Sequence, residues 1–240
     1  MEASVSDLIR GAWVGHALQS NPAEIIRRAT IAKLNRLCIV CNDASDQASG
    51  PAAFKPYNTD FTALSAQLRA VGFAVDAMLW LVADAGYIAA MNAFDATWAD
   101  RKCLDVEEPW VKRDPSHRHD TYESLAAQVA GPYVATAIAY TDFAKAGALT
   151  PVAWLPQVYC TQTAAEKWGV NPRTSPTTAV ARYRQHFPDA PIECAHAAYD
   201  VAPGTIAAAV NAAGPYVAGH WWWSLGQASE AVLREIGATA

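Results

Sequence analysis

The sequence has few charges and no long apolar run. Charged residues make up only 17% of the 240 positions, and the formal net charge is −5 at pH 7. Because proteins that bind duplexes normally carry a basic surface, nucleic acid is not expected as a partner. The apolar stretches are interrupted and only as long as strands, which argues against membrane insertion. Met1–Arg10 has no basic segment followed by an apolar run, so we expect synthesis in the cytoplasm without a secretory signal.

Cysteine is scarce and odd in number: there are five, all within predicted strands. Buried free thiols are therefore expected rather than disulfides. Cys38 and Cys41 have CxxC spacing, but residues three apart in a strand point to opposite faces of the sheet. No second pair follows, so the sequence indicates no zinc or other metal site. It also indicates no organic cofactor.

A glycine-rich phosphate loop is missing as well. Residues 15–20, after the first predicted strand, read Gly-His-Ala-Leu-Gln-Ser, which is not a dinucleotide fingerprint. An open, doubly wound sheet is the alternative fold, and it would have about six strands and a topological switch. The pattern described next has eight.

Eight short runs rich in β-branched and aromatic residues alternate with Ala-rich segments of helical spacing. Strands that alternate with helices imply a parallel sheet, and eight repeats at this length predict a single (β/α)₈ barrel over residues 1–240. The expected strands are Gly11–Gly15, Arg36–Asn42, Ala74–Ala83, Arg101–Glu107, Tyr133–Thr141, Val152–Cys160, Pro191–Asp200 and Tyr216–Ser224. The expected helices include Pro22–Leu34, Asp60–Ala70, Gly86–Trp98, Tyr122–Ala130, Thr177–His186, Gly204–Ala213 and Ser229–Ile236.

Two acidic residues at the end of the fourth predicted strand form the sharpest local motif. Asp105 and Glu107 are two residues apart, so they share a face of the strand, whereas Glu108 points away. Two carboxylates about 7 Å apart at the rim of a barrel cannot both ionise freely, and one is pushed toward its protonated form. A general acid at neutral pH needs this property. The alternative is a solvated acidic loop.

Aromatic and amide side chains gather in the carboxyl-terminal halves of other predicted strands. Aromatic rings stack on the apolar faces of sugars and amides bind their hydroxyls, so this set favours a carbohydrate pocket. His196 is either a further pocket residue or a core histidine. For any one Trp, the alternative is packing between barrel and helices. The candidate substrate-binding residues are Trp80, Tyr140, Gln157, Tyr159, His196 and Trp222.

With these residues in view, the chain resembles the family 25 lysozymes, which are barrel glycoside hydrolases, and is distantly similar to family 18 chitinases. The matching segments are Leu104–Glu107 at strand four, Ala139–Thr141 at strand five, Ala153–Tyr159 at strand six and His220–Ser224 at strand eight. One departure is that family 25 enzymes carry an Asp at the end of strand one, where Gly11–His16 has none.

This resemblance implies a muramidase-like enzyme that acts on the glycan of bacterial peptidoglycan. Glu107 would protonate the leaving oxygen, and Asp105 would hold Glu107 or polarise the acetamido group of the substrate. Such barrels are frequent in phage endolysins, which reach the wall through a holin pore. The missing Asp favours one alternative, a glycan-binding barrel that has lost catalysis. The other is a cytosolic barrel enzyme acting on a small metabolite.

Overall fold

A computed structural model describes residues 8–49, 51–139, 141–214 and 217–239, without the side chains of residues 117 and 118. Eight parallel strands pair in sequence order, and β8 closes on β1. This confirms the predicted (β/α)₈ barrel. The strands are β1 (Ile9–Val14), β2 (Arg36–Val40), β3 (Ala74–Trp80), β4 (Lys102–Asp105), β5 (Tyr133–Ile138), β6 (Ala153–Val158), β7 (Cys194–Ala197) and β8 (Gly219–Trp223).

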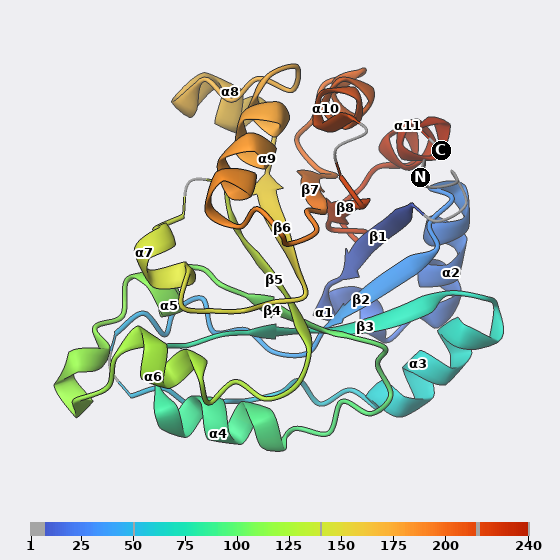
Figure 1. Cartoon of the computed structure of the whole chain (residues 1–240). Coiled ribbons are helices and arrows are strands. Elements are labelled where there is room, and N and C mark those ends of the chain that lie inside the picture. The colour runs from blue at the N-terminus through green and yellow to red at the C-terminus, as the bar shows by residue number, and fades with distance from the viewer. Residues whose placement is uncertain (1–7, 50, 140, 215–216, 240) are drawn as a thin grey trace.

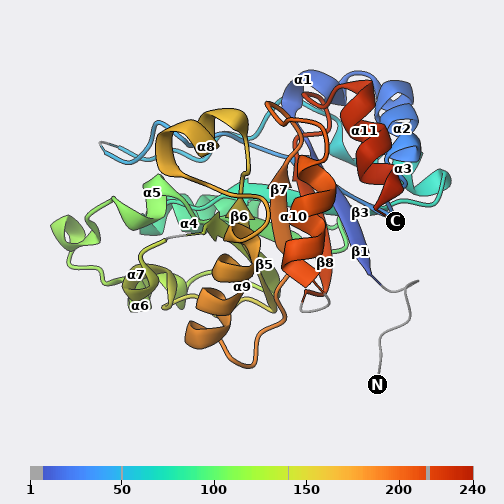
Figure 2. The same ribbon diagram turned by 90° about the horizontal axis from the view of Figure 1, so that it is seen from above.

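Helices surround the strands (Figure 1). Those that cover the barrel are α2 (Pro22–Ile31), α3 (Phe61–Ala70), α4 (Ala85–Ala93), α6 (Tyr122–Ala126), α7 (Phe143–Ala146), α9 (Ser175–His186), α10 (Thr205–Ala213) and α11 (Glu230–Ala238). Three short helices, absent from the sequence-based prediction, directly follow the ends of strands: α1 (His16–Gln19), α5 (Glu108–Val111) and α8 (Gln162–Trp168). Figure 2 shows α1 and α8 on the side of the molecule opposite the start of β1. They therefore border the mouth formed by the carboxyl ends of the strands.

The strands end earlier than their sequence patterns predicted. A parallel strand ends where its neighbours stop offering backbone partners, and β7 pairs with β6 only at Gln157 and Val158. The expected strand Pro191–Asp200 accordingly shortens to Cys194–Ala197. The fourth strand stops at Asp105, so Glu107 lies just past it, at the N-cap of α5. Residues past the strand ends are free to build the mouth of the barrel.

Alternate residues of the strands form two separate hydrophobic layers. Trp13, Cys38, Met78, Leu155 and Trp221 belong to the cluster inside the barrel. The strand residues that alternate with these point outward and pack between the barrel and the helices. Cys41 belongs to this outer layer, whereas Cys38 belongs to the inner one. All five cysteines are buried free thiols.

Gly11 makes room for the indole of Trp221 inside the barrel. A Cβ atom at this position would lie 2.4 Å from ring atoms of Trp221. The indole therefore needs a glycine opposite it on β1. The Trp221 Nε1–H group donates to Oε2 of Glu193 at 2.5 Å, which satisfies the buried indole.

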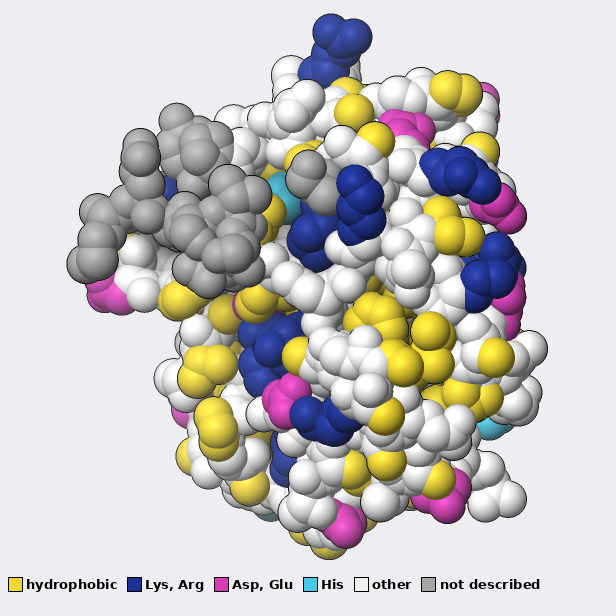
Figure 3. Space-filling model, turned by 90° about the vertical axis from the view of Figure 1, so that its right-hand side faces the viewer, with side chains coloured by type: hydrophobic (Ala, Val, Ile, Leu, Met, Phe, Trp, Pro, Cys, Tyr) yellow, Lys and Arg dark blue, Asp and Glu magenta, His cyan; other side chains and the backbone are white. Residues whose placement is uncertain are grey.

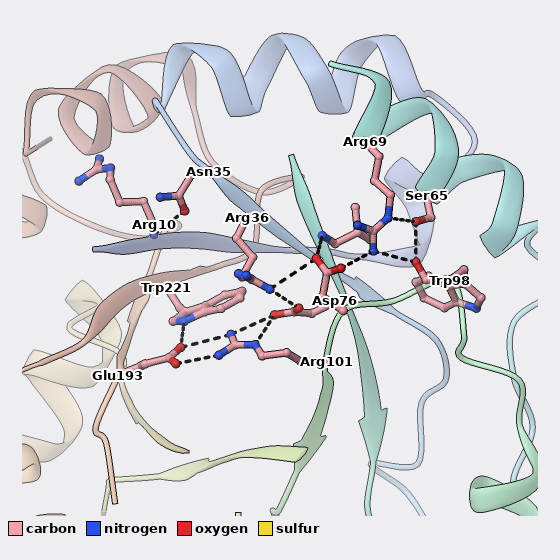
Figure 4. Close-up of polar contacts among 12 residues, drawn as sticks. Arg10, Asn35, Arg36, Ser65, Arg69, Asp76, Trp98, Arg101, Glu193 and Trp221 are labelled. Carbon is pink, nitrogen blue, oxygen red and sulfur yellow. Dashed lines mark hydrogen bonds and ion pairs between the residues drawn. The ribbon is translucent and has the colours of Figure 1, made fainter. Parts of the chain in front are cut away.

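A network of charged side chains closes the amino-terminal end of the barrel (Figure 4). Asp76 on β3 is fully buried and accepts from Arg36 at 2.6 Å and from Arg101 at 3.0 Å. Arg101 also donates to Glu193 at 2.9 Å. Burial raises the pKa of Asp76, and the two guanidinium groups oppose that rise. This end lies opposite the mouth, so the network has a structural role.

The side of the molecule with α2, α3 and α11 carries both signs of charge. Figure 3 shows its Lys and Arg side chains interspersed with Asp and Glu. Arg27, for example, forms an ion pair with Glu24 at 2.7 Å. Within the described ranges, no helix combines the length and the apolar character needed to cross a membrane.

Candidate active site

Asp105 and Glu107 lie together at the mouth of the barrel. Asp105 is the last residue of β4 and is only 3% exposed, while Glu107, two residues further on, is half-buried. Both carboxyl groups line a pocket of about 230 Å³, together with Trp80, Tyr159 and Trp223. The two acidic side chains therefore share a pocket with aromatic walls rather than lying in a solvated loop.

Gln157 links the acidic pair to β6. Its Nε2 atom donates to Oδ1 of Asp105 at 3.1 Å, and it also hydrogen-bonds Glu107, which lowers the pKa of that carboxyl. Gln157 is buried, and its pairing with Ala195 of β7 fixes the backbone beneath it. The amide thus contacts the acidic pair directly, but Gln157 is not among the residues that line the pocket, so its predicted substrate-binding role stays a prediction.

Burial raises the pKa values of both carboxyl groups. The rise is larger at Asp105, which is fully enclosed and further opposed by the charge of Glu107. At Glu107, desolvation also raises the pKa, and the hydrogen bond from Gln157 opposes it. The two carboxyl groups therefore titrate as a coupled unit, and both hold a proton to higher pH than isolated carboxyl groups do.

The aromatic walls of the pocket come partly from residues that the sequence predicted. Trp80 and Tyr159 line it, but Trp222 does not. Trp222 is fully buried in the layer between barrel and helices, where the Arg10 guanidinium lies 5.3 Å from its ring centroid. The indole of β8 in the pocket belongs to Trp223 instead. The placement predicted for Trp222 was wrong because Trp221 and Trp223, not Trp222, face the inside of the strand.

His196 also lies outside the pocket, in the same outer layer as Trp222. It is buried on β7, and its Nε2 atom lies 3.0 Å from Nδ1 of His220. Burial lowers the pKa of His196 well below its ordinary value and lowers the pKa of His220 to about 4. His196 is therefore a core histidine, which was one of the two alternatives from the sequence. The prediction that it binds substrate was wrong.

The buried histidine pair predicts a loss of stability in mild acid. An unfolded histidine has a pKa near 6.5, so the unfolded chain binds protons that the folded one excludes. The contribution of the neutral histidines to the free energy of unfolding is therefore fully present above the unfolded pKa of about 6.5, and it decreases as pH falls toward 4. We expect His220 alone to cost about 2 kcal/mol of unfolding free energy between pH 7.5 and pH 5.

Denaturant unfolding of the His220→Gln variant at the two pH values measures this effect. The difference between pH 7.5 and pH 5 should shrink by about 2 kcal/mol relative to the unmodified protein. His186→Gln, at an exposed histidine, is the matched control. An equal pH dependence in all three proteins would contradict the expected role of the pair.

The remaining predicted residue, Tyr140, lies outside the described residues. Two further residues near the pair were not singled out from the sequence. Tyr199, half-buried after β7, has its pKa raised by burial, by Asp200 and by Glu107. Asp43, exposed after β2, adds to the rise at Asp105. Tyr199 is an even number of residues from the inward-facing Ala195 on the predicted seventh strand. The alternation of side chains along that strand could therefore have indicated it from the sequence.

Comparisons with known proteins support the fold. No protein-family model and no curated protein matches the sequence. Active domain 2 of a thermostable chitinase from Pyrococcus furiosus, crystallised as catalytic site mutants with chito-oligosaccharides, has a TM-score of 0.60 at 12% identity. The match covers 97% of this chain and 94% of that domain.

Two other solved structures show how widely this fold is used. The spore cortex-lytic enzyme SleL from Bacillus cereus has a TM-score of 0.56 at 10% identity, covering 95% of this chain and 73% of SleL. The flavin-binding domain of baker's yeast flavocytochrome b2 has a TM-score of 0.55 at 10% identity, covering 96% and 61%. Glycoside hydrolases are thus among the barrels that this chain resembles, and family 25 lysozymes are not singled out. At these identities the fold alone is shared, so function must be argued from the site.

Within the part of the chain that the structure describes, no three His, Cys, Asp or Glu residues are grouped so as to hold a metal ion.

Proposed function

We propose that the protein is a glycoside hydrolase that acts on a glycan of N-acetylated amino sugars. One observation carries the proposal: two carboxyl groups with raised pKa values share an aromatic pocket at the barrel mouth. Active sites of (β/α)₈ barrels lie at this end. Sugar rings stack on indole and phenol faces, as Trp80, Tyr159 and Trp223 would allow.

In this proposal Glu107 is the general acid that protonates the leaving glycosidic oxygen. It is the more exposed of the two acids, so it is the one that a substrate reaches. Asp105 keeps a proton within the pair and orients the acetamido group, whose carbonyl oxygen then attacks the anomeric carbon. This substrate-assisted route needs no second carboxylate as nucleophile. Gln157 positions the pair, and Tyr159 orients the sugar.

The more specific part of the proposal is the polymer. We propose peptidoglycan as the substrate, which would make the protein a muramidase-like enzyme of the phage endolysin type that reaches the cell wall after release from the cytoplasm. Its support is the sequence resemblance at strands four, five, six and eight. Release of reducing ends from purified peptidoglycan, measured beside chitin as a second N-acetylated polymer, tests both the glycosidase proposal and the choice of peptidoglycan as the substrate. Activity on chitin alone would keep the glycosidase and reject the muramidase.

The Asp105→Asn variant should show a narrower pH range of activity. In the unmodified protein the pair retains a proton up to the upper of its two titrations, and that proton can serve Glu107. With Asn, Glu107 titrates alone at the lower value. The alkaline limb of the kcat/KM profile should therefore move to lower pH, together with a fall in kcat. An alkaline limb that stays in place would exclude Asp105 from holding the proton.

A second candidate function is a glycan-binding barrel without hydrolysis. Gly15 and His16 follow β1 and neither is a carboxylate, so the acid that family 25 lysozymes carry there has no counterpart. Such a protein would pellet with cell walls and leave their turbidity unchanged. Sedimentation and turbidity of the same wall suspension separate the two functions.

A further inference from the structure

The acid pocket is too small for more than about one sugar. Its volume of about 230 Å³ is below the roughly 300–1,000 Å³ typical of small-molecule sites. A longer glycan must therefore continue along the surface next to it.

Trp223 is shared between the pocket and a second hollow. This hollow, of about 410 Å³, lies over the carboxyl ends of β1 and β8 and is lined by His16, Leu18, Trp223, Ser224 and Gln227, among others. The Ser224 hydroxyl donates to Oε1 of Gln227 at 3.0 Å, which orients the amide and leaves its N–H groups able to donate to a ligand. One indole thus connects the acid pair to a polar hollow on one side.

His16 in turn is shared with a third hollow, of about 610 Å³, between α1 and α3. The imidazole is exposed and stacks on Tyr57, with ring centroids 4.1 Å apart and planes at 15°. Tyr57 itself packs against the same inner cluster as Trp80 and Trp223. The ring of His16 is therefore stacked on a side chain that packs against the same inner cluster as the indoles of the pocket.

The floor under His16 is preorganised. Gln19 is buried in α1 and donates to the carbonyl oxygens of Val14 at 3.2 Å and Val40 at 2.7 Å. It also accepts from the Thr59 hydroxyl at 2.8 Å. These bonds tie α1 to the ends of β1 and β2, so binding a ligand here needs little ordering of the protein.

We propose that a neutral saccharide chain extends from the acid pocket across Trp223 to His16, whose ring stacks on a distal sugar. None of the described residues lining the two hollows is Lys or Arg. Neutral amides and hydroxyls recognise sugar hydroxyls, whereas a polyanionic glycan would require cations. The inference rests on the proposed function and adds the direction and the charge class of the substrate.

Calorimetric binding of N-acetylglucosamine oligomers with two to six residues tests this inference, using the Glu107→Gln full-length chain to prevent turnover. Affinity should rise with oligomer length. His16→Ala in that background should lower the affinity for the longest oligomer roughly three- to tenfold and leave the dimer unchanged. His16→Phe, which keeps a flat ring, should restore most of the loss.

Trp168→Ala is the matched control, because Trp168 is 74% exposed on α8 and lines neither hollow. A gain with length that survives His16→Ala, or that disappears in Trp168→Ala instead, would overturn the inference, as would no gain at all. Polygalacturonate should not compete, and competition would reject the neutral class. If oligomers bind as described but the unmodified protein cleaves none, only the hydrolase proposal fails. If the oligomers are cleaved and His16→Ala changes neither their binding nor their cleavage, only this inference fails.

Discussion

The Glu107→Gln variant should fold normally and lose glycan hydrolysis by about 10²–10⁴-fold in kcat, the usual contribution of general acid–base catalysis. Glutamine keeps the shape of the side chain but has no transferable proton. Glu107 is half-buried beside Asp105, and a glutamine of the same shape fills the same space, so the substitution opens no cavity there. Release of reducing ends from peptidoglycan and chitin measures the loss, and circular dichroism checks the fold.

Glu108→Gln is the matched control for this experiment. Glu108 is the next residue, but it is exposed on α5 and pairs with Lys112. Its neutralisation should leave kcat within about twofold, because an exposed ion pair is worth little and Glu108 does not line the pocket. The opposite pattern, with activity retained by Glu107→Gln and lost by Glu108→Gln, would show that the wrong acid has been assigned.

The second large effect concerns stability rather than catalysis. Asp76→Ala should lower the free energy of unfolding by about 3 kcal/mol, because it leaves two guanidinium groups without their shared buried partner. This is the lower end of the losses that follow when one partner of a buried ion pair is removed. Each arginine retains another acidic partner: Arg101 pairs with Glu193 at 2.9 Å and Arg36 with Asp100 at 3.8 Å. Urea unfolding at pH 7 measures it.

Glu230→Gln provides the comparison for this stability effect. Glu230 is about half exposed and pairs with Arg27 and Arg234 on the surface. Removing its charge should cost less than about 1 kcal/mol. If Asp76→Ala costs no more than this control, the network at the base of the barrel is not a stabilising element.

The barrel could be predicted from the sequence because two independent signals agreed. Alternating strand and helix segments imply a parallel sheet, and eight of them at this length close a barrel. The acidic pair was predictable for a similar reason, since residues two apart in an extended chain share a face, and the backbone of Glu107 stays extended (φ −111°, ψ −148°) past the end of β4. Gln157 and Tyr159 followed from the same rule on β6.

The orientation of β8 could not be predicted. Periodicity separates Trp221 and Trp223 from Trp222, but three identical side chains do not reveal which face points into the barrel. The structure settles it through Gly11, the only neighbour small enough on β1 to admit Trp221. His196 shares this ambiguity, because an inward or outward imidazole has the same pattern of neighbours in the sequence.

The two hollows beside the acid pocket could not be predicted from the sequence either. His16 and Tyr57 are 41 positions apart, and their stacking depends on α1, a four-residue helix too short for a periodic signal. Contacts between loops after different strands arise only once the barrel has closed. Such residues need a structure to be found.

Mass analysis of the fragments that the unmodified protein releases from peptidoglycan and from N-acetylglucosamine oligomers tests the central proposal most directly. A glycoside hydrolase should produce saccharides whose masses correspond to cleavage of one glycosidic linkage with the addition of one water. Intact polymers and oligomers, recovered unchanged while the protein remains bound to them, would contradict hydrolysis and leave a glycan-binding barrel.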